Sequence, residues 1–491
     1  MKVLPVHLPI KLNQIFGAVI SWQKVDFDLI RASLTNIKFE LYTPDMLIFS
    51  ARKLSAMTFL KAAIALAVTL AVVHFYGTPF ASAAGVNFYV STTGSDTNPG
   101  TDSAKPFKTI QKAIDNAQPG DVINLSSGTY MQDFITKRNG EQSLPITIKG
   151  SSTAIVKGGG NGRIIEINHD YIILQGFTVD GLFGSSSSSS GYRDKLIYFQ
   201  GKEAKAGVKG AKVLNMSLKN AGGECVRFRY FAENNEVSGN TITNCGVFDF
   251  KFSGGGKNGE GVYIGTAPEQ LADGKNPTTD RDLSNNNWVH HNTFNTQGNE
   301  CVDIKEASSG NIIENNKCTG QKDSNSAGLD SRGNDNIFRS NESYGNRGAG
   351  IRIGGDTSSD GAGNHIYKNN IYNNASGGIK FMRTPQGQVC SNTFSGNTVG
   401  DSMGTYGSSY TPTTACTSAI DSLPTYPYPV VTPNPLPTPT ATPIPLPSIS
   451  PIPSPILGST IPFPAPTSET TLKVFVTQMI SFLQTYLSML P

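Results

Sequence analysis

The chain has 491 residues, enough for several globular domains or for one long repeat domain. Lysine and arginine (40) nearly balance aspartate and glutamate (37), and only 16% of the residues are charged. A nucleic-acid-binding protein needs a concentrated basic surface, so this composition argues against nucleic acid as a partner. The 51 glycines, together with dense asparagine between positions 234 and 397, indicate many turns and therefore short strands.

The N-terminal region carries the features of an export signal. An apolar run at 62–73 follows Lys61, and Ala81-Ser82-Ala83 supplies the small residues that a signal peptidase requires. The run is short for a membrane span. We therefore predict a signal peptide at 57–83 and a secreted or cell-surface protein, with an uncleaved anchor as the alternative. Residues 1–56 remain an upstream segment without an assigned role, explained by a true start at Met46 or Met57.

An amphipathic helix is predicted at 106–117, with Ile110 and Ile114 on one face. Three apolar segments after it, at 122–125, 146–148 and 172–179, have the length and composition of short strands. If these strands begin a stacked repeat, the helix covers its open first coil, which would otherwise expose its core and its strand edges.

The middle of the chain repeats itself. Each unit opens with a small residue, after which apolar and polar positions alternate. The six segments are Cys225–Phe228, Gly261–Ile264, Cys301–Ile304, Gly328–Ser331, Gly350–Ile353 and Gly378–Phe381. A second block places an asparagine three residues after an apolar residue, at Asn240, Asn292, Asn316, Asn341, Asn369 and Asn392.

A unit of this length cannot bury its own apolar face, but coils stacked on one another can. The chain lacks the leucine lattice of leucine-rich repeats, and its units are too short for propeller blades. We therefore predict an all-β domain over 84–422, a right-handed parallel β-helix with coils across 86–400. The asparagines would turn inward and hydrogen-bond to the neighbouring coil. Insertions at 183–194, 248–259 and 265–284 are predicted to be loops that wall a groove on the side of Lys305.

The segment from Phe88 to Tyr130 resembles the opening of secreted pectin-lyase-like β-helix proteins. These include pectate lyases of polysaccharide lyase family 9, and the alginate lyases and chondroitinase B of family 6. The resemblance spans roughly 86–400 and implies the fold, but it does not by itself fix an activity.

Charged residues alternate with the inward positions of the repeated strands and should form columns along one outer face. One column contains Arg227, Tyr263, Asp303, Asp330, Arg352 and Lys380, and a second includes Lys305 and Arg332. We expect both to lie on a solvent face, with Glu224, Glu260 and Glu300 in the turns before their strands. A purely solubilising ladder of charges is the alternative interpretation.

This set of residues suits eliminative cleavage of a uronate polymer, which needs a base and a positive charge near the substrate carboxylate. We predict that Lys305 is the base, its pKa lowered by the neighbouring cation Arg332, which acts as acid or carboxylate clamp. Glu300, Asp303 and Asp330 are the candidate Ca²⁺ ligands. Substrate binding is assigned to the remaining column members, Arg227, Tyr263, Arg352 and Lys380.

The resemblance adds to these assignments. The segment from Glu300 to Lys305 is similar to the family 6 segment in which an acidic calcium ligand lies five residues before the catalytic lysine, and Gly328–Gly333 resembles the segment that carries the catalytic arginine. Gly298 stands where family 6 has a second acidic ligand, and the acidic cluster of family 9 is missing.

The six cysteines contain no CxxC pair, which argues against a zinc site. A disulfide between Cys390 and Cys416 would close the end of the repeat domain. The other four cysteines, Cys225, Cys245, Cys301 and Cys318, are predicted to be buried as small apolar residues. Beyond the repeats, a proline-rich linker is predicted at 423–467 and a tail helix at 468–491, which would contact a membrane interface or the cell surface or else be disordered.

The sequence therefore favours a secreted, monomeric polysaccharide lyase acting on an acidic polysaccharide such as pectate or alginate. Two alternatives stay open. One is a non-catalytic β-helix that binds surface glycans. The other is an epimerase, or a hydrolase that uses Asp303 and Asp330 as its two carboxylates.

Overall fold

The computed structural model describes residues 40–43, 46–48 and 85–425. The predicted signal peptide and tail helix lie outside these residues, as do most of the upstream segment and of the proline-rich linker. Two short strands upstream, β1 (Glu40–Thr43) and β2 (Met46–Ile48), pair antiparallel. Among the described residues, no helix is both apolar enough and long enough to cross a membrane.

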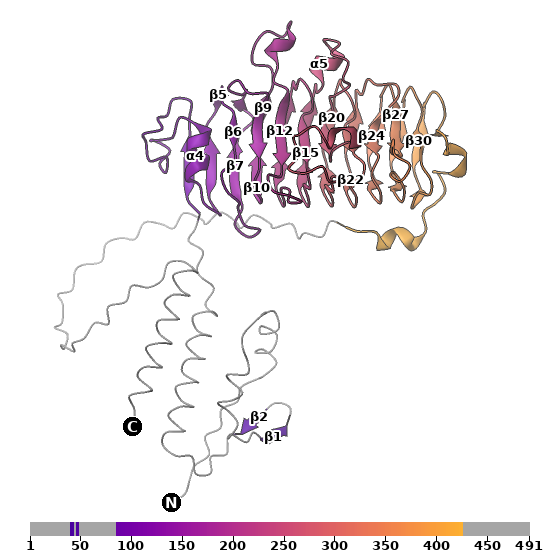
Figure 1. The fold of residues 1–491 in the computed structure, drawn as a ribbon, viewed down its shortest axis with the longest axis horizontal. Coiled ribbons are helices and arrows are strands. Elements are labelled where there is room, and N and C mark those ends of the chain that lie inside the picture. Colours follow the sequence, from indigo (N-terminus) through magenta and orange to yellow (C-terminus); the bar gives the residue numbers. More distant parts are fainter. Residues whose placement is uncertain (1–39, 44–45, 49–84, 426–491) are drawn as a thin grey trace, which may run out of the picture. The chain divides into compact units, whose positions relative to one another are not determined.

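Residues 85–403 form a right-handed parallel β-helix of stacked coils, which confirms the predicted fold class (Figure 1). Within this part of the chain, three sheets run the length of the solenoid, and successive coils pair in parallel and in register. Three-residue strands are frequent because turns interrupt each coil, as the abundance of glycine and asparagine predicted.

Sheet 1 contains β3 (Asn87–Val90), β4 (Val122–Leu125), β7 (Ile146–Gly150), β10 (Ile172–Gln175), β13 (Lys212–Leu214), β16 (Glu236–Ser238), β19 (Trp288–His290), β22 (Ile312–Glu314), β25 (Ile337–Arg339), β28 (His365–Tyr367) and β31 (Val389–Cys390). Sheet 2 contains β5 (Gly128–Tyr130), β8 (Ala154–Val156), β11 (Thr178–Asp180), β14 (Ser217–Lys219), β17 (Thr241–Thr243), β20 (Thr293–Asn295), β23 (Lys317–Thr319), β26 (Glu342–Tyr344), β29 (Asn370–Tyr372) and β32 (Thr393–Ser395). Sheet 3 contains β6 (Phe134–Ile135), β9 (Arg163–Ile167), β12 (Lys195–Gln200), β15 (Val226–Arg229), β18 (Val262–Ile264), β21 (Val302–Ile304), β24 (Ala327–Ser331), β27 (Ala349–Ile353), β30 (Ile379–Phe381) and β33 (Ser402–Met403).

The core runs as one continuous apolar column between the sheets. Val302 and Ile351, predicted to point inward, are fully buried in it. The N-terminal end is covered by α4 (Ile110–Asn116), which buries Ile110 and Ile114 as predicted. The side chain of Thr109 accepts a hydrogen bond from the backbone N–H of Lys112, which caps the first turn of the helix.

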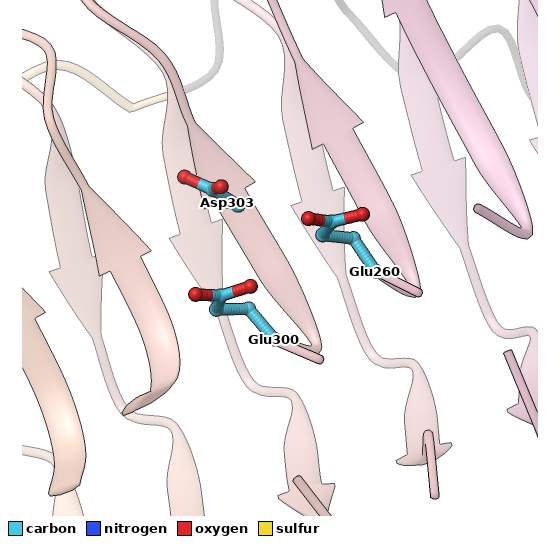
Figure 2. Close-up of side chains that lie close together, drawn as sticks. All are labelled: Glu260, Glu300 and Asp303. Carbon is cyan, nitrogen blue, oxygen red and sulfur yellow. The ribbon is translucent and has the colours of Figure 1, made fainter. Parts of the chain in front are cut away.

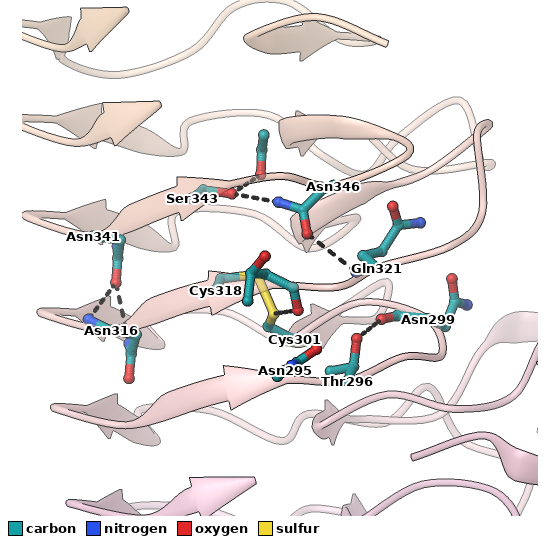
Figure 3. Close-up of a disulfide and its surroundings, with 12 residues drawn as sticks. Asn295, Thr296, Asn299, Cys301, Asn316, Cys318, Gln321, Asn341, Ser343 and Asn346 are labelled. Atoms are coloured by element: carbon teal, nitrogen blue, oxygen red, sulfur yellow. Dashed lines mark hydrogen bonds between the residues drawn. A yellow bond between two sulfur atoms is a disulfide. The ribbon is translucent and has the colours of Figure 1, made fainter. Parts of the chain in front are cut away.

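The asparagine column is confirmed. The backbone N–H of every member except the last, Asn392, donates to the side-chain oxygen of the asparagine one coil further on, as Asn316 does to Asn341 at 3.1 Å (Figure 3). The structure adds a second column that the sequence analysis missed, five positions earlier in each coil: Asn235, Asn287, Asn311, Asn336 and Asn364. These side chains satisfy polar groups that a buried turn would leave unpaired.

The predicted disulfide between Cys390 and Cys416 is confirmed. The other four cysteines are buried, as predicted, but they also form disulfides, which was not predicted. Cys225 pairs with Cys245, and Cys301 pairs with Cys318 (Figure 3). Each of these two bonds joins the residue before a sheet 3 strand to a residue on, or just after, the following sheet 2 strand. The sequence alone did not show that the coil brings the two cysteines of each pair together, with Cα atoms 5.6 Å apart in the first pair and 5.9 Å apart in the second.

The three predicted insertions are loops, without a regular stacked strand in any of them. They contain only short helical turns: η1 (Ser189–Gly191), α5 (Val247–Phe250), whose last residues begin the second insertion, and η2 (Pro268–Gln270). At the C-terminal end, η3 (Gly407–Ser409) and η4 (Ser418–Ser422) follow the last coil.

Candidate functional site

The candidate site lies on the outer side of sheet 3, where β18, β21, β24 and β27 stand next to one another. The parallel register places Tyr263 beside Asp303, Asp303 beside Asp330, and Asp330 beside Arg352. This is the column that strand alternation predicted. Glu260 and Glu300 lie just before β18 and β21, in equivalent positions of two neighbouring coils (Figure 2).

Three carboxylates converge at this place. Glu260, Glu300 and Asp303 each present an oxygen, and these oxygens all lie within 4.8 Å of one another (Figure 2). All three residues are buried. Glu260 accepts a hydrogen bond from the backbone N–H of Gly259 at 2.9 Å, and Glu300 accepts one from the hydroxyl of Ser326. Oε2 of Glu300 and Oδ1 of Asp303 have no hydrogen-bond partner among the described residues.

The crowding of these charges shifts their pKa values. Burial, Glu224 and Asp303 raise the pKa of Glu260 to about 7. Burial, Asp303 and Glu260 raise the pKa of Glu300 well above its usual value. Burial alone would also raise the pKa of Asp303, but the cations Lys305 and Arg332 lower it. The raised pKa values show that Glu260 and Glu300 resist ionisation beside Asp303 unless a further positive charge is present.

Lys305 and the acidic group are in contact. The Lys305 ammonium lies 2.6 Å from Oδ2 of Asp303 and 4.7 Å from the centre of the Tyr263 ring. On the far side of that coil, the Arg227 guanidinium lies 3.5 Å from the same ring. Two cations therefore lie against the Tyr263 ring, and each is attracted to the electron-rich face of the ring.

The predicted lowering of the Lys305 pKa is wrong for the structure as it stands. Burial and Arg332 do lower the pKa, as expected, but Asp303, Tyr263 and Glu260 outweigh them, and the pKa is raised. The error arose because the prediction considered only the cation on the next coil. It left out Asp303, which lies two residues earlier on the same strand.

Asp330 lies next to Asp303, but its carboxylate contacts Arg332 and Arg352 and does not join the acidic group. Arg352 donates to Asp330 at 2.9 Å, and the Nε of Arg332 lies 3.6 Å from the same oxygen. Both arginines also contact Asp356, at 2.5 and 3.2 Å. Of the three predicted metal ligands, the structure thus brings Glu300 and Asp303 together, and it places Asp330 with the arginines.

Arg227 belongs to a separate buried ion cluster one coil earlier. It donates to Glu224 at 2.6 Å, and Lys195 contacts the other oxygen of that carboxylate. Burial alone would raise the pKa of Glu224, but these two cations lower it to about 2. Arg227 is therefore held by Glu224 beneath Tyr263, and it does not line the cavity described next.

A cavity of about 320 Å³ opens over the site. Its floor contains Glu260, Tyr263, Glu300 and Lys305, and its wall contains Arg332 and Arg352. Two of the predicted loops wall it, 248–259 through Lys257 and Asn258, and 265–284 through Glu269 and Gln270. The predicted placement of these insertions beside Lys305 is confirmed.

The prediction that both columns lie on a solvent face is wrong for most of their members. Asp303 and Asp330 are fully buried, and Arg227, Tyr263, Lys305 and Arg352 are almost so. The covering loops and the tightly paired side chains exclude solvent, and strand alternation alone carries no information on such cover. Lys380 is half-buried at the edge, where it donates to the backbone oxygen of Asn325 at 3.1 Å.

The acidic group fits a hard divalent cation such as Ca²⁺. It offers carboxylate oxygens from Glu260, Glu300 and Asp303 within reach of one ion, and two of these residues have an oxygen without a partner. Ca²⁺ takes six to eight oxygen ligands, so water or substrate oxygens would complete its shell. The sequence analysis did not assign Glu260 to the metal, although its place in the turn, equivalent to that of Glu300, was visible.

Comparisons with known proteins place the chain in a family. A family model described as "Protein of unknown function (DUF1565)" matches residues 92–426. The chain belongs to this family. The uncharacterized protein YwoF of Bacillus subtilis (strain 168) is 30% identical over 135 residues, which are 26% of this DUF1565 chain and 28% of YwoF. The match therefore spans less than a third of that relative.

Two solved structures are similar in fold. An alginate lyase from Paenibacillus sp. str. FPU-7 is 23% identical, with 60% of this chain and 93% of that chain covered and a TM-score of 0.46. The pectate lyase Pel9A is 14% identical, with 68% and 82% covered and the same TM-score. At these identities the likeness concerns the β-helix fold of the DUF1565 chain and not its activity.

Proposed function

We propose that this protein is a polysaccharide lyase that cleaves a uronate-containing glycan by β-elimination. The observation that carries the proposal is one cavity lined by the amine of Lys305, two guanidinium groups and two buried carboxylates, with Asp303 within 4.8 Å of these carboxylates. The guanidinium groups are those of Arg332 and Arg352, and the carboxylates are those of Glu260 and Glu300. Elimination beside a carboxylate requires this combination of a base and fixed positive charge.

Lys305, as the free amine, takes the proton from C5 of the uronate. The electron pair of the broken C–H bond forms the C4–C5 double bond, and the bond between C4 and the glycosidic oxygen breaks. The Lys305 ammonium then returns its proton to the leaving oxygen. The products are a new chain end and an unsaturated uronate.

Arg332 acts as a clamp on the substrate carboxylate. Burial alone would lower the pKa of Arg332, but Asp303, Asp330 and Glu300 raise it, so its guanidinium stays charged throughout. A permanently charged fork is suited to holding a carboxylate and unsuited to giving up a proton. Arg352, fixed by Asp330, adds a second positive charge on the same wall.

The acidic group is the part of the site that would hold Ca²⁺. A Ca²⁺ ion bound there would add positive charge beside the uronate carboxylate as that carboxylate gains charge. A cation that shared Asp303 and Glu260 would weaken the effect of these carboxylates on Lys305, and Arg332 would then favour the free amine.

Secretion forms part of the proposal. Three disulfides link all six cysteines, which suits an oxidising compartment outside the cytoplasm. The hydrolase alternative has less support, because Asp303 and Asp330 do not line the cavity and both are held by cations. A purely solubilising ladder does not account for oxygens that are buried and lack partners.

The test is a screen of the secreted protein on polygalacturonate, alginate and glycosaminoglycans, with and without Ca²⁺. The proposal expects a rise in ultraviolet absorbance from the unsaturated product on at least one polymer. Reducing ends that form without this absorbance would indicate a hydrolase. Binding without cleavage of any polymer would indicate a glycan-binding protein.

A further inference from the structure

A second cavity of about 300 Å³ lies on the other side of the 265–284 loop. Glu269 and Gln270 of this loop line the first cavity, whereas Pro268 and Leu271 line the second. The short helix η2 is therefore the partition between them. The opposite wall of the second cavity is the turn that contains Thr357 and Ser359.

The two cavities also share the segment that follows β21. Lys305 lines the first and the next residue, Glu306, lines the second. Asp356 binds Arg332 and Arg352 through its side chain, and its backbone N–H donates to Glu306 at 3.2 Å. Asp356 therefore links residues that line the first cavity to one that lines the second.

The two cavities differ in their balance of charge. The lining of the first contains four basic residues and four acidic ones, namely Lys257, Lys305, Arg332, Arg352, Glu260, Glu269, Glu300 and Asp323. The second is lined by three acidic residues, Asp282, Glu306 and Asp360, and by one cation, Arg281. That cation is already engaged, because its Nη2 lies 2.5 Å from both oxygens of Asp360. A uronate carboxylate would therefore meet an excess of acidic residues in this cavity.

The other lining groups suit an uncharged sugar. Pro268 and Leu271 offer apolar surface for a ring face. The hydroxyl groups of Thr357 and Ser359 donate to Asp360, and their oxygens can accept hydrogen bonds from a sugar. Glu306 is 2% exposed, and its Oε2 has no hydrogen-bond partner among the described residues. Burial raises its pKa, which favours a carboxylic acid able to donate to a sugar oxygen. The volume is at the lower end for ligand pockets, which suits one sugar unit.

We infer that the second cavity is a subsite for an uncharged sugar unit, so that the substrate alternates a uronate with a neutral sugar. This inference rests on the proposed lyase function, since the uronate is placed by the first cavity. It narrows the substrate from acidic polysaccharides in general to mixed polymers, and it argues against pectate or alginate homopolymers as the best substrates.

The experiment compares the full-length protein on two classes of polymer. Polygalacturonate and polymannuronate represent homopolymers, whereas the rhamnogalacturonan backbone and hyaluronan alternate a uronate with an uncharged sugar. We expect kcat/KM to be at least about tenfold higher on one of the alternating polymers, a difference that a single well-made subsite can supply. A preference for a homopolymer would overturn the inference while leaving the lyase proposal intact.

A matched pair of variants locates the effect. Ser359→Trp fills the second cavity from an exposed turn, and Ser358→Trp adds the same bulk to the neighbouring exposed residue, which does not line it. We expect Ser359→Trp to raise KM on the alternating polymer about tenfold or more, and Ser358→Trp to leave it unchanged. Equal KM values for the two variants would overturn the inference.

The failure of the proposed function gives a different result. If the wild-type protein releases no unsaturated product from any polymer, the lyase proposal falls, and calorimetry with the alternating tetrasaccharides decides the subsite alone. Binding that Ser359→Trp abolishes and Ser358→Trp retains supports the subsite. Absence of binding in the wild type contradicts it.

Discussion

Calcium should stabilise the folded protein through the acidic group. Glu260, Glu300 and Asp303 are buried within 4.8 Å of one another, and the raised pKa values of the two glutamates reflect the cost of that crowding. A ligand that binds only the folded state at 100 times its Kd contributes about 2.7 kcal/mol. For a domain the size of residues 85–425, this corresponds to a rise in Tm of about 4 °C.

The assay is thermal unfolding followed by circular dichroism, in EDTA and in excess Ca²⁺, with calorimetry to measure Kd. Glu300→Gln removes one charge of the group and should abolish most of the shift. Glu342→Gln changes the same residue type on sheet 2, where it pairs with Lys317, and should keep the full shift. An unchanged Tm of the wild type in Ca²⁺, or a shift that survives in Glu300→Gln, would refute the reasoning.

Three further predictions concern the β-helix itself. Replacing Cys301 and Cys318 together by alanine opens a disulfide whose cysteines are 17 residues apart and should cost about 3 kcal/mol in urea unfolding; no loss would show that the bond does not hold the fold. Asn316→Ala leaves buried polar groups of two coils unpaired and should lower the free energy of unfolding by about 2–3 kcal/mol. The control Asn295→Ala, on the surface, should cost about 0.5 kcal/mol or less, and equal losses would argue against the role of the asparagine column. The lowered pKa of Glu224 stabilises the fold above the unfolded pKa of about 4.5, and this stability is lost as the pH falls toward 2. Glu224→Gln should therefore be less stable than the wild type by about 3 kcal/mol at pH 7 and nearly equal to it at pH 2. A constant difference in stability across this pH range would contradict the assignment.

The fold could be predicted because the residues that determine it recur at regular spacing along the sequence. Alternating apolar positions placed Val302 and Ile351 in the core, and the spacing of asparagines such as Asn316 and Asn341 gave the coil period. Both signals require only that equivalent residues recur once per coil. Capping by the helix around Ile110 followed from the same reasoning, because the end of a solenoid has to be covered.

The candidate site was only partly predictable. Strand alternation brought Asp303 and Lys305 to the outer side, but their burial depends on loops whose paths the repeat does not determine. The pKa of Lys305 depends on a 2.6 Å contact with Asp303, and no spacing rule supplies that distance. The repeat placed Glu260 and Glu300 in equivalent turns, but it did not show that their carboxylate oxygens approach within 4.8 Å of each other.

The most direct test of the account is the release of unsaturated product by the wild-type protein and by Lys305→Ala on the best substrate of the screen. Lys317→Ala serves as the control, since Lys317 is an exposed lysine of sheet 2 that does not line the cavity. The account predicts loss of at least about 10³-fold in kcat for Lys305→Ala, with an unchanged circular dichroism spectrum, and near wild-type turnover for Lys317→Ala. Turnover by Lys305→Ala within about tenfold of the wild type would contradict it.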